Sequence, residues 1–304
     1  MEAINLEGHS NPIYAVVAHP EKKLCYTAGN DKGIVEWDIA LKKFSRLFTE
    51  VAQTIYCLEI ILSQNILVAG CNNGHILIFD LETTRLKSTI DVKSPVFCLK
   101  YEAHKNELLA STDAGEILVI NTDGQKIVHQ FQSGSQKIRS LDFNYLHNIL
   151  ATSSNDNSVR VYKLEDYTFI QQLEAHTMGV GAVAFSPDGN TMLTGSRDAH
   201  LKAWDTVSWI CKKDIAAHLF AIYLIAFHPT LPYFATCSRD KTIKIWRTTD
   251  YSLLKNLGID KGVNAHRLSV NQICWSADGG NLISVSDDKL VKVWRLKVEA
   301  TSNF

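Results

Sequence analysis

An internal repeat of about 42 residues runs along the chain and restricts its fold more than any other sequence feature. One position in each unit closes a short β-type segment with an aromatic or apolar residue. The position recurs at Trp37, Phe79, Ile120, Tyr162, Trp204, Trp246 and Trp294. The spacing is 41 or 42 residues except for the last interval, which is 48. Such a period indicates a modular architecture built from one supersecondary unit.

A histidine provides a second marker in four of the units. It stands 28 residues before the closing tryptophan in each case. The four dipeptides are Gly8-His9, Ala175-His176, Ala217-His218 and Ala265-His266. Four identical offsets define a register along the chain.

Each unit divides into four short segments, of which the fifth unit gives the clearest example. An apolar run at 180–185 precedes a turn at 186–189 with Pro187, Asp188 and Gly189. Further runs follow at 192–196 and 201–204, and a more polar run such as 169–173 leads into the next unit. Proline, aspartate and glycine favour tight turns, and no helical periodicity interrupts the runs. Four strands per unit of this length are typical of a propeller blade.

The dipeptides Gly8-His9 and Trp37-Asp38, with their equivalents, resemble the namesake motif of the WD-repeat β-propeller family. A further acidic or amide residue lies six positions before the closing residue in six units, and Ala114 replaces it in the third. These six are Asp31, Asn73, Asp156, Asp198, Asp240 and Asp288. We therefore expect an all-β, seven-bladed propeller with four antiparallel strands per blade, forming a single domain over residues 1–304.

The two ends of the chain predict how the ring closes. Residues 4–9 are similar in character to residues 170–176, which form a fourth segment and the following histidine marker. The last unit has three segments, ending soon after Trp294. We expect the N-terminal segment to supply the outer strand of the last blade, which removes exposed strand edges.

Histidine, a hydroxyl residue, aspartate and tryptophan occur together at fixed offsets in four units. The sets are His9, Thr27, Asp31, Trp37; His176, Thr194, Asp198, Trp204; His218, Thr236, Asp240, Trp246; and His266, Ser284, Asp288, Trp294. They have the composition of catalytic triads, but the family resemblance implies structural networks. In these, the indole N–H donates to the hydroxyl, the hydroxyl to the imidazole, and the carboxylate holds the imidazole. A hydroxyl committed in this way is not a free nucleophile.

Units two to four lose members of the set together. Val51, Val92 and Gly134 replace the histidine, and Ala69 and Ala110 replace the hydroxyl residue in units two and three. A half-satisfied buried network is worse than an apolar one, so joint loss favours a structural role.

Composition excludes several classes of protein. Lys plus Arg total 31 and Asp plus Glu total 32, a net charge of −1 that argues against a dedicated nucleic-acid binder. No apolar run is long enough for a membrane helix, and no signal peptide is visible. The seven cysteines show no CxxC spacing and are expected to be thiols.

Two histidines outside the networks, His19 and His228, each stand before a proline and are interpreted as turn residues. We expect an intracellular, cytoplasmic protein without cofactor or metal, and a monomer by itself.

Candidate binding residues come from two columns of the repeat, one five residues after the histidine position and one just before the aspartate position. The aromatic and basic members are Tyr14, Tyr56, Phe97, Arg139, Arg197, Tyr223 and Arg239. These residue types anchor many interfaces, so we expect them on a protein-binding rim. The alternative is that the aromatics pack between blades and the arginines are solvated.

Six additional residues before the last unit, 258–263, predict an enlarged loop that includes Asp260 and Lys261. This loop is either a neutral insertion or the flank of a site for an acidic peptide, shared with Arg197, Arg239 and Tyr223.

Two functions remain open from the sequence. The first is a non-catalytic scaffold or adaptor that binds other proteins or peptides through the rim and channel mouth. The second is a propeller enzyme or small-ligand binder, which would need convergent carboxylates or histidines near the ring axis.

Overall fold

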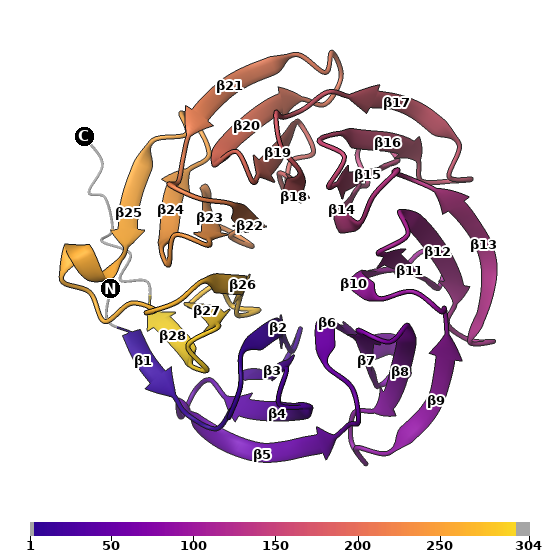
Figure 1. The fold of residues 1–304 in the computed structure, drawn as a ribbon, viewed down its shortest axis with the longest axis vertical. Coiled ribbons are helices and arrows are strands. Elements are labelled where there is room, and N and C mark those ends of the chain that lie inside the picture. Colours follow the sequence, from indigo (N-terminus) through magenta and orange to yellow (C-terminus); the bar gives the residue numbers. More distant parts are fainter. Residues whose placement is uncertain (1–2, 296–304) are drawn as a thin grey trace.

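Seven four-stranded antiparallel sheets form a closed ring in the computed structural model, which describes residues 3–295 (Figure 1). The innermost strands are β2 (Ile13–Ala18), β6 (Ile55–Ile61), β10 (Val96–Glu102), β14 (Ile138–Asn144), β18 (Val180–Phe185), β22 (Ile222–Phe227) and β26 (Val270–Trp275). The second strands are β3 (Leu24–Gly29), β7 (Ile66–Cys71), β11 (Glu107–Thr112), β15 (Ile149–Ser154), β19 (Thr191–Ser196), β23 (Tyr233–Ser238) and β27 (Asn281–Ser286).

The third and outer strands complete the blades. The third strands are β4 (Gly33–Asp38), β8 (His75–Asp80), β12 (Glu116–Asn121), β16 (Val159–Lys163), β20 (His200–Asp205), β24 (Ile243–Arg247) and β28 (Val291–Arg295). The outer strands are β5 (Lys43–Glu50), β9 (Leu86–Asp91), β13 (Lys126–Gln132), β17 (Phe169–Leu173), β21 (Cys211–Ala216), β25 (Leu253–Leu257) and β1 (Ala3–Leu6). Two short 3-10 turns, η1 (Leu62–Gln64) and η2 (Ile259–Lys261), lie between strands. The expected fold class is confirmed.

The ring closes between the two ends of the chain. Strand β1 pairs antiparallel with β28, in a register from Ala3 opposite Trp294 to Leu6 opposite Val291. It is thus the outer strand of blade 7, the blade of β26, β27 and β28 (Figure 1). The predicted mode of closure is confirmed.

Apolar side chains fill the interfaces between blades. The buried residues divide into seven clusters, and each cluster joins two neighbouring blades. Leu6 and Val291 of blade 7, for example, share a cluster with Ile13 and Trp37 of blade 1. No blade has a core of its own, because both faces of each sheet are covered by adjacent sheets.

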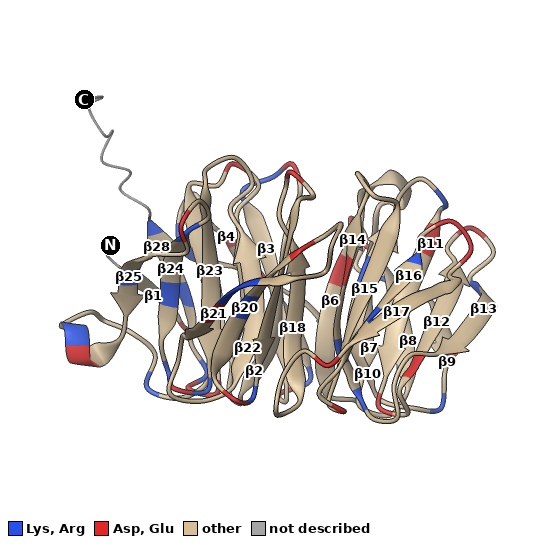
Figure 2. Cartoon of the chain, turned by 90° about the horizontal axis from the view of Figure 1, so that it is seen from above, with Lys and Arg blue, Asp and Glu red and all other residues tan. Residues whose placement is uncertain are grey.

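The strands run between the two faces of the disc (Figure 2). One face carries the turns from the second to the third strand together with the loops that enter the next blade. The two sets of loops are bonded to each other, as in the bonds from the Arg197 N–H to the Gly179 carbonyl and from the Arg239 N–H to the Ala221 carbonyl. We call this side the loop face. It surrounds one mouth of the central channel.

Candidate functional site

The four sets of histidine, hydroxyl residue, aspartate and tryptophan form continuous hydrogen-bond chains. In blade 1 the Trp37 indole N–H donates to Thr27 Oγ1 at 2.7 Å. Thr27 Oγ1 lies 2.7 Å from His9 Nε2, and His9 Nδ1 lies 2.7 Å from Asp31 Oδ2. Blades 5, 6 and 7 repeat the arrangement at 2.8–3.2 Å. Each chain ties the third strand to the second strand and to two loops.

Burial and hydrogen bonding fix the protonation of the chain in blade 7. Burial lowers the pKa of His266 more than the Asp288 carboxylate raises it. Burial also raises the pKa of Asp288, but hydrogen bonds from His266 and from the backbone N–H groups of Arg267 and Leu290 outweigh this and bring it to about 2. A neutral imidazole therefore donates from Nδ1 to an ionised carboxylate and accepts the hydroxyl proton at Nε2. The hydroxyl is used on both sides and buried, which leaves it no free position for attack.

Blade 4 carries a rebuilt network that the repeat register did not reveal. The Tyr162 hydroxyl donates to Ser133 Oγ at 2.9 Å, and Ser133 Oγ lies 2.7 Å from Thr152 Oγ1. Arg160 forms an ion pair with Asp156 at 2.9 Å, replacing the missing histidine as the partner of that carboxylate. The serine stands one residue before the expected histidine position, so no fixed offset pointed to it.

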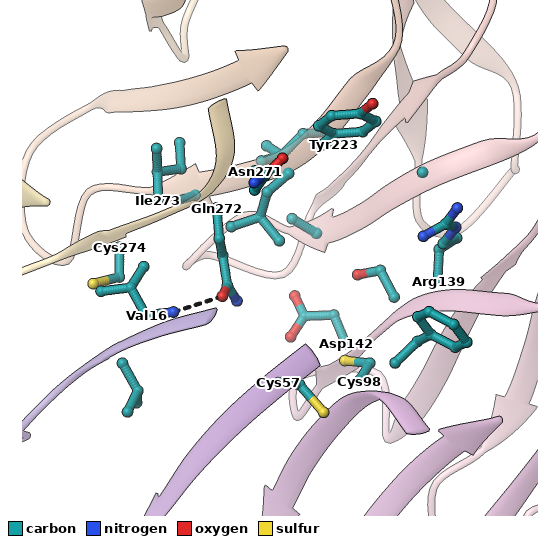
Figure 3. A pocket seen from close by; sticks show the side chains of 18 of the residues that line it. Val16, Cys57, Cys98, Arg139, Asp142, Tyr223, Asn271, Gln272, Ile273 and Cys274 are labelled. Carbon is teal, nitrogen blue, oxygen red and sulfur yellow. Dashed lines mark hydrogen bonds between the residues drawn. The ribbon is translucent and has the colours of Figure 1, made fainter. Parts of the chain in front are cut away.

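The second candidate set surrounds the mouth of the central channel, which has a volume of about 1060 Å³. Every innermost strand shifts its register at a β-bulge near this mouth. The residues at the bulges are Tyr14, Tyr56, Phe97, Arg139, Gly181, Tyr223 and Asn271. A bulge re-aims the side chain that it carries. All seven line the channel, and Arg139, Tyr223 and Asn271 face its interior in Figure 3.

The aromatic members of this set contact one another. The Tyr14 and Tyr56 rings lie 5.7 Å apart between centroids, and Tyr56 stacks on Phe97 at 4.9 Å. The Arg139 guanidinium lies 5.3 Å from the centroid of Phe97, and Lys137 Nζ lies 3.9 Å from the same centroid. An aromatic arc over blades 1 to 3 therefore continues into a basic region at blade 4.

Blades 4 to 6 contribute the remaining cations. Arg197 and Arg239 line the channel with Arg139 and Tyr223. Burial lowers the pKa of Arg139 and raises that of Tyr223, while Arg239 opposes the rise in Tyr223. A cluster of this kind favours an anionic group, because a carboxylate accepts charge-assisted hydrogen bonds from several guanidinium donors.

Asp260 and Lys261 lie apart from this cluster. They belong to η2 in the loop between β25 and β26, which projects from the outer edge of the ring (Figure 1). Neither residue lines the channel. Their side chains pair with each other at 3.1 Å. The loop follows the outermost strand of blade 6, so its additional residues extend the outer edge of the ring and do not approach the channel mouth.

A second layer of polar side chains lines the channel below the bulges, and the sequence columns missed it. Lys100 Nζ forms an ion pair with Asp142 Oδ1 at 2.8 Å. Three side chains of this layer, Asp142 among them, each accept a hydrogen bond from a backbone N–H of the innermost strand of the next blade. They are Glu59 from Tyr101 at 3.2 Å, Asp142 from Phe185 at 2.8 Å and Gln272 from Val16 at 2.7 Å, the last drawn in Figure 3. These side chains accept hydrogen bonds from backbone N–H groups on the strand edges that face the channel.

The pKa of Glu59 gives a test of this layer. Burial raises it to about 7, although the Lys100 charge opposes the rise. Because the folded protein holds the Glu59 proton more tightly than the unfolded chain, this residue contributes most to the free energy of unfolding below pH 4.5. The contribution is lost as the pH rises through about 7. Glu59→Gln keeps the acceptor for Tyr101 without the charge. We expect its free energy of unfolding to exceed that of the parent by about 1–3 kcal/mol at pH 8, and by much less at pH 5. Urea midpoints at both pH values measure the difference, and a pH-independent difference would contradict the assignment.

His19 and His228 are buried in turns. The Nδ1 of each ring accepts hydrogen bonds from two backbone N–H groups, those of Glu21 and Lys22 for His19 and those of Thr230 and Leu231 for His228.

The seven cysteines are free thiols, four of them buried. Among residues 3–295, no three His, Cys, Asp or Glu side chains are grouped to hold a metal ion. Over the same residues, the structure contains no helix of the length and apolarity that a bilayer crossing requires.

Seven four-stranded sheets closed in a ring define a β-propeller. The model of the WD domain, G-beta repeat, matches residues 2–38, 167–205, 209–247 and 260–295. These are the blades with complete histidine networks. The model of the anaphase-promoting complex subunit 4 WD40 domain matches residues 103–183. The chain belongs to the WD-repeat β-propeller family. Comparison with curated proteins gives no significant match.

Proposed function

We propose that this propeller is a non-catalytic scaffold that binds a peptide segment of a partner protein at the mouth of its channel. WD-repeat propellers generally act as protein-interaction scaffolds, and one matching family model is named for a subunit of a complex. The observation that carries the proposal is the ring of bulged residues, which places stacked aromatics next to arginines around one opening. Aromatic and arginine side chains in partly desolvated positions are the residues that dominate binding energy at interfaces.

The polar groups of the channel favour binding over catalysis. Asp142 is held by Lys100 and by a backbone N–H of the next blade, and Glu59 is held by a backbone N–H. A general acid or base must be free to exchange a proton with a substrate. The carboxylates of this layer are instead engaged in holding blades together.

The double variant Phe97→Ala with Arg139→Ala tests the site. A partner captured from cells that express the protein, then purified, is titrated against parent and variant by calorimetry. We expect affinity to fall at least about tenfold, because both side chains line the mouth and contact each other. A matched control, Lys126→Ala with Lys213→Ala on outer strands, should bind like the parent. Unchanged affinity in a variant with a native melting temperature would place the binding site elsewhere.

A further inference from the structure

The loop face is asymmetric in a way that the channel mouth does not explain. In the loop that enters each blade, the second residue after the histidine position is polar in blades 1 to 4 and apolar in blades 5 to 7. The polar residues are Asn11, Gln53, Ser94 and Gln136, and the apolar ones are Met178, Phe220 and Leu268. Leu219 adds a fourth apolar side chain. The side chains of Met178 and Leu268 are each 46% exposed, that of Phe220 is 56% exposed and that of Leu219 is 82% exposed. We call these four residues the apolar crescent.

Hydrogen bonds place the apolar crescent on the loop face, beside the channel mouth. Ser196 Oγ donates to the Met178 carbonyl at 2.9 Å, and Ser238 Oγ donates to the Phe220 carbonyl at 3.1 Å. Ser286 Oγ donates to the Leu268 carbonyl at 3.4 Å. Each serine precedes the residue that leads the turn into the third strand. The side chains of the crescent are therefore presented by loops that are anchored to the blades.

Cations outnumber anions around the apolar crescent. Five exposed basic residues stand on the same loops and turns of blades 5 to 7: Arg197, Arg239, Lys241, Arg267 and Lys289. Within residues 3–295, none of the five takes part in an ion pair. The neighbouring carboxylates Asp198, Asp240 and Asp288 accept hydrogen bonds from the buried histidines, and Asp287 accepts one from Asn271. The five basic side chains thus have no ion pair of their own in the described part of the chain and are available to the carboxylates of a partner.

We propose that the apolar crescent and these five cations bind one acidic peptide segment of a partner protein that also carries large apolar side chains. Exposed apolar side chains rimmed by polar groups mark interaction sites, and the unpaired cations select carboxylates by charge complementarity. The inference rests on the proposed function, because the segment would continue from this sector into the mouth through Arg197 and Arg239. It adds the chemistry of the partner and a second binding area outside the channel.

The test uses a displayed library of random 12-residue peptides selected on the purified propeller. We expect enrichment of peptides that combine several Asp or Glu with Leu, Phe or Trp. Labelled copies of the enriched peptides should bind Leu219→Ser with Phe220→Ser at least about tenfold more weakly than the parent. They should also lose affinity in Arg267→Ala with Lys241→Asn, in which asparagine suits the positive φ of 73° at that position. Higher salt should weaken binding to the parent.

Matched variants separate this inference from the proposed function. Asn11→Ala with Gln136→Ala changes the same loop position in blades 1 and 4 and should leave affinity unchanged. Peptides that lose affinity only in Phe97→Ala with Arg139→Ala would support the channel mouth and overturn the apolar crescent. Peptides affected by the crescent variants alone would support the crescent and contradict the mouth. Enrichment without acidic residues, or tighter binding of a 20-nucleotide single strand or anionic vesicles than of the peptides, would overturn the inference.

Discussion

Deletion of residues 1–7 is expected to lower the melting temperature by more than about 10 °C and to cause aggregation, because it opens the ring. The deletion removes β1, the outer strand of blade 7. The β28 edge then loses its hydrogen-bonding partner, and Leu6, which is 4% exposed in the intact ring, no longer covers the last interface. An unpaired, buried-type strand edge is a template for pairing with another chain.

The buried amine of Lys292 adds to the cost of the deletion. This side chain is 1% exposed and donates to Asn5 Oδ1 at 2.6 Å, as well as to two oxygens of Asn264. Burial lowers its pKa, and the charge of Asp288 only partly offsets this. Removing Asn5 takes away one of three acceptors. With the apolar burial of β1, we expect a loss of about 4–6 kcal/mol, a large part of the stability of a typical domain.

Differential scanning calorimetry and size-exclusion chromatography measure both expected effects. A synthetic peptide of residues 1–9 should restore the melting temperature when added in excess, since it supplies the missing strand. The double substitution Leu41→Ser with Leu86→Ser serves as a control, because both leucines are exposed on the surface. A monomeric deletion with the parent melting temperature would show that β1 does not hold the ring closed.

The register of tryptophans and histidines was sufficient to predict the blades and their closure. Each unit has apolar residues on both faces of its sheet and must bury them against neighbours, so regular spacing leaves few architectures. The column containing Tyr14 and Arg139 pointed to the channel mouth for the same reason. Residues at the same position of the repeat occupy equivalent places in all seven blades.

The residues that escaped prediction depend on local departures from the repeat. A simple strand alternates with period two, but the bulge in β6 places the partly exposed Tyr56 and Glu59 three residues apart. The sequence does not mark that change of phase, so the second channel layer was missed. The length of the loop containing Asp260 indicated an insertion but not its direction. The asymmetry of the apolar crescent emerges only once the loops are known to share a face.

Replacing Thr236 by Val in blade 6 is expected to lower the free energy of unfolding by about 2–5 kcal/mol. The two side chains have nearly the same shape, but the change removes the oxygen between Trp246 Nε1 and His218 Nε2, which lie 2.9 and 2.8 Å from it. Both nitrogen atoms would then be buried without a partner, each at a cost of about 1–3 kcal/mol. Urea unfolding at pH 7 measures the loss.

Blade 2 shows which combination should recover part of this loss. It occupies the four network positions with Val51, Ala69, Asn73 and Phe79. Transferring that set to blade 6 gives His218→Val, Thr236→Ala, Asp240→Asn and Trp246→Phe. Each of the four single changes leaves a buried polar group without its hydrogen-bond partner, whereas the combined change removes the whole network. We expect the combined variant to cost at least about 2 kcal/mol less than the sum of the four single costs, since residues in one network are strongly coupled. Additivity within about 0.5 kcal/mol would mean that the four side chains act independently, and that their joint absence from blade 2 has another origin.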